Sequence, residues 1–221
     1  MTIRQNEKFC RICDSPSILF FQDTRTFYKC PECRLIFSED FPDKKDEENH
    51  YKTQWQTTHP DFWKGQVDVL VQLITNYRTP KNILDFGSGS GEMTREFLKR
   101  GYDITPLEPM IHGYLKEQNY PAQFDVVIVV EVLEHLQDPW KEIHEIENVL
   151  SPDGIVIFST LLTNEFIDRP DAANHFRNWW YKDDPTHVSF FCNHVLSKMA
   201  DMENYDIDII GDKVFVLKRT P

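Results

Sequence analysis

The sequence predicts an α/β protein built on a parallel sheet and preceded by a small metal-binding module. Two observations predict this class. From Asp61 onward, valine- and isoleucine-rich runs alternate with segments of helical periodicity, a pattern typical of a parallel sheet. Before that region, two Cys-x2-Cys pairs stand 16 residues apart, which is the spacing of a structural zinc site.

Local patterns predict the elements in order. The first helix spans 61–78, because its apolar residues recur at spacings of three and four and Pro80 follows its end. Asn82–Phe86 is a short buried strand that leads into a glycine-rich loop. The other predicted elements are strands over 102–108, 124–132 and 155–160, helices over 92–100, 110–118, 138–150 and 193–202, a turn at 151–154, and a C-terminal antiparallel hairpin over 205–210 and 214–218.

The charge balance of the chain is acidic. Its 221 residues include 36 acidic and 24 basic ones, for a formal net charge of −12. Such a surface repels a phosphate backbone, so we expect no nucleic-acid partner. The longest apolar run, 126–133, is too short to span a bilayer, and the N-terminus lacks a signal-peptide core. We therefore expect a cytoplasmic protein without a membrane partner.

The glycine-rich loop in ILDFGSGSGEMTREF is the most informative segment for ligand binding. Gly87, Gly89 and Gly91 permit tight turns and the close approach of a ligand. The dinucleotide pattern G-x-G-x-x-G fails, because Glu92 stands at its sixth position. Asp85 would oppose a pyrophosphate, whereas S-adenosylmethionine (SAM) carries cationic groups that a carboxylate attracts. The residues favour SAM.

Residues 83–91 resemble the first motif of class I SAM-dependent methyltransferases, in which an apolar strand precedes D-x-G-x-G-x-G. The segments QFDVVIVVEVLEHL and VLSPDGIVIFS resemble the fourth strand of this family and its turn into the fifth, with Asp153 in place of the first glycine of that turn. The resemblance implies a Rossmann-like class I methyltransferase sheet. We expect SAM to be bound by Asp85, Gly87, Gly89, Gly91, Glu108 and Glu131, with Glu108 on the ribose hydroxyls.

The segment between Glu108 and Asp125 departs from the family pattern. Only 16 residues separate the two positions, and a two-turn helix uses about half of them. We therefore expect the family's third strand to be shortened or missing. The adenine wall that normally follows this strand would then be thin, formed by Asn119 and Tyr120, or supplied by another segment.

The four paired cysteines predict a structural zinc site. Cys10, Cys13, Cys30 and Cys33 can close a tetrahedron of thiolates, which leaves no position open for a catalytic water. A module this small has little core, so zinc would supply much of its folding free energy. The sequence thus divides into a zinc ribbon (1–40), a linker (41–60) and a class I SAM-dependent methyltransferase domain (61–221), and we expect the cores of ribbon and domain to be separate.

Two segments after the predicted strands contain candidate catalytic residues. His135 follows the fourth strand, and it is either a general base or a capping or packed residue. The segment NWWYKDDPTHVSFF contains Tyr181, Asp184 and His187, and it resembles a segment over the acceptor site of zinc-ribbon methyltransferases. Alternatively, its aromatic residues simply cover the core. We expect His187, oriented by Asp184, to be the proton acceptor, with His135 and Tyr181 as the other catalytic candidates, and Glu134 to be solvated.

The combination of ribbon and methyltransferase domain resembles the sugar C-methyltransferases of polysaccharide and antibiotic pathways, although their further C-terminal domain has no counterpart in this sequence. The resemblance implies methyl transfer from SAM to a small-molecule acceptor such as a sugar. The alternative is a non-catalytic protein with the SAM-binding fold, whose zinc ribbon docks a protein partner.

Overall fold

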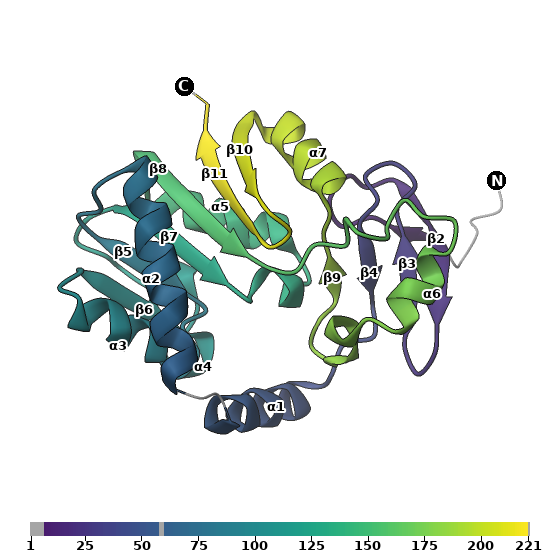
Figure 1. The fold of residues 1–221 in the computed structure, drawn as a ribbon, viewed down its shortest axis with the longest axis horizontal. Helices are drawn as coiled ribbons and strands as arrows, with labels where there is room; N and C mark the ends of the chain where they lie inside the picture. The colour runs from purple at the N-terminus through teal and green to yellow at the C-terminus, as the bar shows by residue number, and fades with distance from the viewer. Residues whose placement is uncertain (1–6, 58–59, 221) are drawn as a thin grey trace. The chain divides into compact units, whose positions relative to one another are not determined.

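A computed structural model describes residues 7–57 and 60–220 (Figure 1). The chain forms two compact units. The unit that contains the cysteine pairs, here called the ribbon unit, consists of 1–42, 131–142 and 159–221. The other unit, here called the sheet unit, consists of 43–130 and 143–158. Each unit is therefore built from segments that are far apart in the sequence.

The sheet unit contains the parallel sheet that the alternating pattern predicts. Its strands follow the spatial order β8-β7-β5-β6, and β5 pairs in parallel with both β6 and β7. All seven residues of β7 are buried, as expected for a strand with helices on both sides. The bounds of these strands are β5 Ile83–Phe86, β6 Ile104–Leu107, β7 Phe124–Val130 and β8 Leu150–Ser159.

Helices connect the strands of this sheet, and two further helices precede its first strand (Figure 1). The connecting helices are α3 Glu92–Lys99, α4 Pro109–His112 and α5 Pro139–Val149, and α1 Lys44–Thr57 and α2 Pro60–Tyr77 come before β5. The helix predicted over 110–118 is shorter, because only α4 and the 3₁₀ helix η1 Leu115–Glu117 form there. Helix α1 occupies most of the segment predicted as a linker. Among the residues that the structure describes, every helix is too short or too polar to cross a lipid bilayer.

The family's third strand is missing, as the short spacing after Glu108 predicts. Residues 108–123 are all described, and they contain only α4 and η1. Strand β6 therefore forms one edge of the sheet. One local prediction was wrong: residues 151–154 do not form a turn before the strand, because β8 already begins at Leu150 and includes them.

The ribbon unit contains a second, antiparallel sheet with the order β1-β2-β3-β4-β9. Its strands are β1 Lys8–Phe9, β2 Pro16–Gln22, β3 Thr26–Lys29, β4 Ile36–Ser38 and β9 Ser189–Phe190. The other elements of this unit include η2 Leu133–His135, α6 Ala172–Arg177, η3 Trp180–Asp183, α7 Asn193–Glu203 and the predicted hairpin, β10 Tyr205–Ile210 with β11 Val214–Arg219.

The expectation that the ribbon has a separate core was wrong. Strand β9, from the C-terminal part of the chain, extends the ribbon sheet by pairing with β4. The ring of Phe176 on α6 lies edge-on to both Phe27 and Phe190, with centroid distances of 4.9 and 5.3 Å. The three rings are fully buried. Apolar burial thus joins the cysteine-containing strands and the C-terminal segment of the ribbon unit in one core.

We predict that Phe176→Ala destabilises the ribbon unit by about 3–5 kcal/mol, the cost of removing a fully buried ring. Urea unfolding followed by near-ultraviolet circular dichroism measures this loss. Ile18→Ala, at a position that is 60% exposed on β2, is the control and should leave the midpoint unchanged. Equal effects of the two substitutions would contradict the shared core.

Candidate functional site

The glycine loop of the sheet unit has the backbone conformation that its sequence requires. Gly87, Gly89 and Gly91 have φ values of 75°, 53° and 76°, in the left-handed region where a side chain is strained. A Cβ atom at Gly89 would also lie 3.0 Å from the indole nitrogen of Trp55, which comes from α1. Glycine is therefore needed at this position for conformation and for space.

Glu108 lies against this loop. Its carboxylate accepts hydrogen bonds from the backbone N–H groups of Gly89 (3.1 Å) and Met110 (3.2 Å), so that it also caps α4. The ring Nδ1 of His112 accepts a hydrogen bond from the backbone N–H of Glu108 at 2.9 Å. Burial raises the pKa of this carboxyl group. The structure thus brings Glu108 and the predicted glycines together.

Asp85 is fully buried near the end of β5, just before the glycine loop. Its Oδ2 accepts a hydrogen bond from the hydroxyl of Thr94, while its Oδ1 has no hydrogen-bond partner among the described residues. Burial, with a contribution from Glu108, raises the pKa of Asp85 to about 7. Its predicted role in binding SAM stays a prediction.

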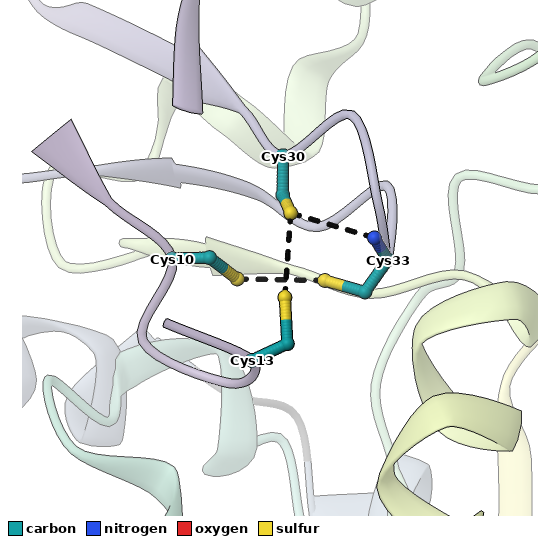
Figure 2. Close-up of side chains that lie close together, drawn as sticks. All are labelled: Cys10, Cys13, Cys30 and Cys33. Carbon is teal, nitrogen blue, oxygen red and sulfur yellow. Dashed lines mark hydrogen bonds between the residues drawn. The ribbon is translucent and has the colours of Figure 1, made fainter. Parts of the chain in front are cut away.

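The four paired cysteines lie together in the ribbon unit (Figure 2). The sulfur atoms of Cys10 and Cys33 are 3.4 Å apart, and those of Cys13 and Cys30 are 3.5 Å apart. These separations exceed a disulfide bond by more than an ångström, and they are close to the edge of a tetrahedron with zinc–sulfur distances of about 2.3 Å. The donor set and its spacing therefore fit a zinc ion.

The two cysteine turns have the same backbone geometry. In each, the N–H of the first cysteine donates to the carbonyl five residues later, Ser15 in one turn and Leu35 in the other. The residues after the second cysteines, Asp14 and Arg34, have positive φ values of 55° and 66°. This repetition is typical of the two knuckles of a zinc ribbon.

The first knuckle also holds the segments that contain the catalytic candidates. The guanidinium group of Arg11 donates to the carbonyl of Ser38 (2.7 Å) and to the hydroxyl of Ser189 (3.0 Å), on β4 and β9. The indole of Trp140 donates to the carbonyl of Ile12 at 2.8 Å. The two residues between Cys10 and Cys13 thus connect the knuckle to other parts of its own unit.

A buried group of acidic and hydroxyl side chains lies beside these contacts. The hydroxyl of Tyr181 is 2.6 Å from Oε1 of Glu134 and 3.0 Å from Oε2 of Glu131. One hydroxyl proton can be donated to only one of these carboxylates at a time. Burial, then the nearby Glu131, raises the pKa of Glu134 to about 8. Burial, then Glu134, raises the pKa of Tyr181.

Glu131, a predicted SAM ligand, directly follows β7 and has a left-handed backbone with φ of 52°. A non-glycine residue in this region costs conformational energy, and such strain concentrates at functional sites. Its carboxylate also pairs with Lys213 at 3.0 Å. Its contact with SAM stays a prediction.

His135 and His187 complete this cluster, with ring centroids 4.6 Å apart. The Nδ1 of His187 lies 2.7 Å from the carbonyl oxygen of Tyr181, and the Nδ1 of His135 lies 3.2 Å from that of Thr186. Burial lowers the pKa of His187, which is 6% exposed. The structure therefore brings the three catalytic candidates together; their catalytic roles stay predictions.

One expectation about this cluster was wrong: Glu134, expected to be solvated, is fully buried at its centre. Asp184 was expected to orient the ring of His187, and its Oδ2 lies 3.9 Å from Nε2 of that ring. Its Oδ1 accepts hydrogen bonds from Thr186, and the carbonyl of Tyr181 faces Nδ1 of the ring, so the role of Asp184 stays a prediction. The sequence did contain a signal for Glu134, because it stands in the same short segment as Glu131 and His135.

Comparison with known protein families identifies the class of this chain. A family model described as "Methyltransferase domain" matches residues 61–208. This match covers well over half of the chain, and the fold and the glycine loop agree with it. The chain belongs to this methyltransferase domain family.

Curated relatives include ubiquinone biosynthesis O-methyltransferases. That of Photorhabdus laumondii is 31% identical over 107 residues, which cover 38% of this chain and 45% of the relative. That of Idiomarina loihiensis is 29% identical over 160 residues, which cover 61% of this chain and 65% of the relative. The matched region is therefore less than two thirds of the length of either relative.

Solved structures share the fold. The plantazolicin methyltransferase BpumL in complex with S-adenosylhomocysteine (SAH) superposes with a TM-score of 0.54 at 15% identity, covering 81% of this chain and 91% of that one. The Burkholderia thailandensis 1,6-didemethyltoxoflavin-N1-methyltransferase, with 1,6-didemethyltoxoflavin and SAH bound, has a TM-score of 0.53 at 14% identity, covering 90% of this chain and 97% of that one. At these identities the likeness concerns the fold alone.

The buried carboxyl group of Asp85 predicts a pH-dependent stability. Folding raises the pKa of Asp85 from 3.8 to about 7, so its contribution to the free energy of unfolding is fully present below pH 4. This contribution is lost as the pH rises from about 4 through about 7. The loss amounts to roughly 4 kcal/mol, at 1.4 kcal/mol per pH unit. Asp85→Asn cannot ionise, so its melting temperature relative to the wild type should rise between pH 5 and pH 8. Asp153→Asn makes the same substitution at an exposed position and is measured alongside; a melting-temperature difference for Asp85→Asn that does not change with pH would refute the assignment.

Proposed function

We propose that this protein transfers a methyl group from SAM to an oxygen atom of a small polar acceptor. The observation that carries the proposal is the glycine loop with Glu108 hydrogen-bonded to Gly89, in a chain of the methyltransferase domain family. The fold also occurs in methyltransferases solved with SAH.

In this proposal the sheet unit binds SAM. The backbone of Gly87, Gly89 and Gly91 allows the ligand to approach closely. Glu108 exchanges its hydrogen bond with Gly89 for bonds to the ribose hydroxyls, a role typical of an acidic residue after the second strand of a Rossmann-like sheet. Asp85 is a further proposed ligand of SAM in the sheet unit, and Glu131, which belongs to the ribbon unit, stays a predicted ligand.

The ribbon unit provides the acceptor side through Tyr181, His135 and His187. A hydroxyl group must lose its proton as it attacks the methyl carbon, and the two imidazoles are the side chains whose ordinary pKa suits this step. Their Nδ1 atoms face carbonyl oxygens, and their Nε2 atoms lie 3.9 and 4.0 Å from Oε1 of Glu134. We place the loss of the acceptor proton at this cluster.

The class of acceptor follows from two considerations. The curated relatives named above are O-methyltransferases, which favours oxygen as the acceptor atom. The N-terminal ribbon resembles that of sugar-pathway methyltransferases, which favours a sugar or a related polar metabolite.

The alternative is a non-catalytic protein whose ribbon docks a partner. The first knuckle gives this alternative no support, because Arg11 and Ile12 contact their own unit.

We further propose that Cys10, Cys13, Cys30 and Cys33 hold one structural zinc ion as thiolates, in a reducing compartment such as the cytoplasm. Four sulfur ligands would fill a tetrahedron, so this ion would hold the two knuckles together without taking part in methyl transfer. Its role would be to fix the knuckle that contacts β9 and Trp140.

We predict that Cys30→Ser lowers the zinc content of the purified, reduced protein well below one ion per chain and disorders the whole ribbon unit, because the ribbon and β9 share one sheet. Elemental mass spectrometry and limited proteolysis measure the two effects. Cys192→Ser, at a buried cysteine outside the cluster, should keep its zinc. Full zinc content in Cys30→Ser would exclude the thiolate site.

We predict that Glu108→Ala weakens SAM binding by about 1–3 kcal/mol, the cost of losing hydrogen bonds to a charged acceptor, and that Gly89→Val abolishes it. Calorimetry with SAM and with SAH measures both affinities. Asp103→Ala, an exposed carboxylate before the opposite end of β6, is the matched control and should bind as the wild type does. Absence of SAM and SAH binding by the wild type would overturn the proposed function.

A further inference from the structure

We propose that Glu134, His135 and His187 form a binding site for a divalent transition-metal ion, separate from the cysteine cluster. The proposal rests on the proposed function and changes one step of it, because the metal ion, with the two imidazoles as its ligands, activates the acceptor oxygen in place of an imidazole base. One ligand atom from each of the three side chains can be chosen so that all of these atoms lie within 4.8 Å of one another. Two imidazoles and a carboxylate are a ligand set that first-row transition metals accept.

The neighbours of the two imidazoles fix which nitrogen can bind an ion. A carbonyl oxygen only accepts hydrogen bonds, so the Nδ1 atoms that face Tyr181 and Thr186 must carry the protons. In both rings the lone pair is then on Nε2. Metal-binding histidines are commonly oriented by such a bond from the other ring nitrogen to a backbone carbonyl.

Both Nε2 atoms lie near the same carboxylate oxygen. They are 3.9 Å (His135) and 4.0 Å (His187) from Oε1 of Glu134. These distances are too long for hydrogen bonds. They exceed by about half an ångström the ligand-to-ligand edge of roughly 3.3 Å expected around an ion with bonds of 2.0–2.1 Å, so small rotations of the side chains would close the site.

Glu134 provides an independent observation. Its side chain is fully buried, and its Oε2 has no hydrogen-bond partner among the described residues. A buried carboxylate oxygen without a partner is costly, and an absent ion or water is one of the few explanations for it. Glu131, which shares the hydroxyl of Tyr181 with Glu134, adds a second negative charge nearby. A cation would compensate both.

The bound cation would activate the acceptor as a Lewis acid. The acceptor hydroxyl coordinates the ion, which lowers the pKa of that hydroxyl, and its proton leaves to solvent. The oxygen lone pair then forms the bond to the methyl carbon of SAM while the carbon–sulfur bond breaks, and the electron pair of that bond goes to sulfur. The two histidines serve as ligands, and the products are a methyl ether and SAH.

Mn²⁺ is the probe for this site, because imidazole and carboxylate ligands hold it while thiolates favour softer ions. The zinc-loaded protein is titrated with Mn²⁺ alone, and the electron paramagnetic resonance signal of free Mn²⁺ is followed. We expect one Mn²⁺ per chain. His187→Ala, His135→Ala and Glu134→Gln should each weaken binding at least about tenfold, with the cysteine-bound zinc retained as evidence of folding.

His175→Ala removes another histidine of the ribbon unit that also lies beside a carboxylate, 3.2 Å from Asp171, and it should bind Mn²⁺ as the wild type does. A free Mn²⁺ signal that stays undiminished in excess wild-type protein, or equal binding in all the variants, would overturn the site. SAH binding measured in EDTA tests the proposed function separately. Methyl transfer at full rate in EDTA would support the proposed function but overturn activation by the metal ion, because an imidazole without bound metal would then accept the proton.

Discussion

The contact between the first cysteine knuckle and the segments of its own unit is the constraint on which the candidate site depends. Arg11 lies between two cysteines, and its guanidinium group reaches the backbone of β4 and a side chain of β9. Arg25, from the turn between β2 and β3, donates to the carbonyl of Asp184 at 2.8 Å and to that of His187. The cysteine-containing strands and turns of the ribbon unit therefore hold the segment that contains His187 in place.

In the ribbon unit, apolar packing buries titratable side chains, and this burial shifts their pKa values. Tyr181 and Glu134 are buried in the same unit as the rings of Phe176 and Phe190, so the hydroxyl and the carboxylate have few water molecules to bind. Their mutual hydrogen bond compensates part of this cost, whereas the left-handed backbone of Glu131 adds a conformational cost of its own. Such a cluster is costly for stability, and costly clusters of titratable groups are typical of functional sites.

Periodicity and turn chemistry predicted much of the fold. The parallel strands, the missing third strand after Glu108 and the C-terminal hairpin follow from local patterns, and so does the approach of the four cysteines. The pairing of β4 with β9 could not be predicted, because it joins residues about 150 positions apart and β9 has only two residues. For the same reason the burial of Glu134 was missed, since its cover comes from Tyr181 and its neighbours.

The interleaving of the two units has a consequence for synthesis on the ribosome. The cysteine pairs emerge first, whereas β9 and the ring of Phe176, which complete their sheet and core, are made some 140 residues later. Domains generally fold as units during synthesis, and the sheet unit ends at residue 158, so it is complete before the ribbon unit. During this interval the thiols of the nascent chain are exposed to oxidants, and early capture of a metal ion would protect them.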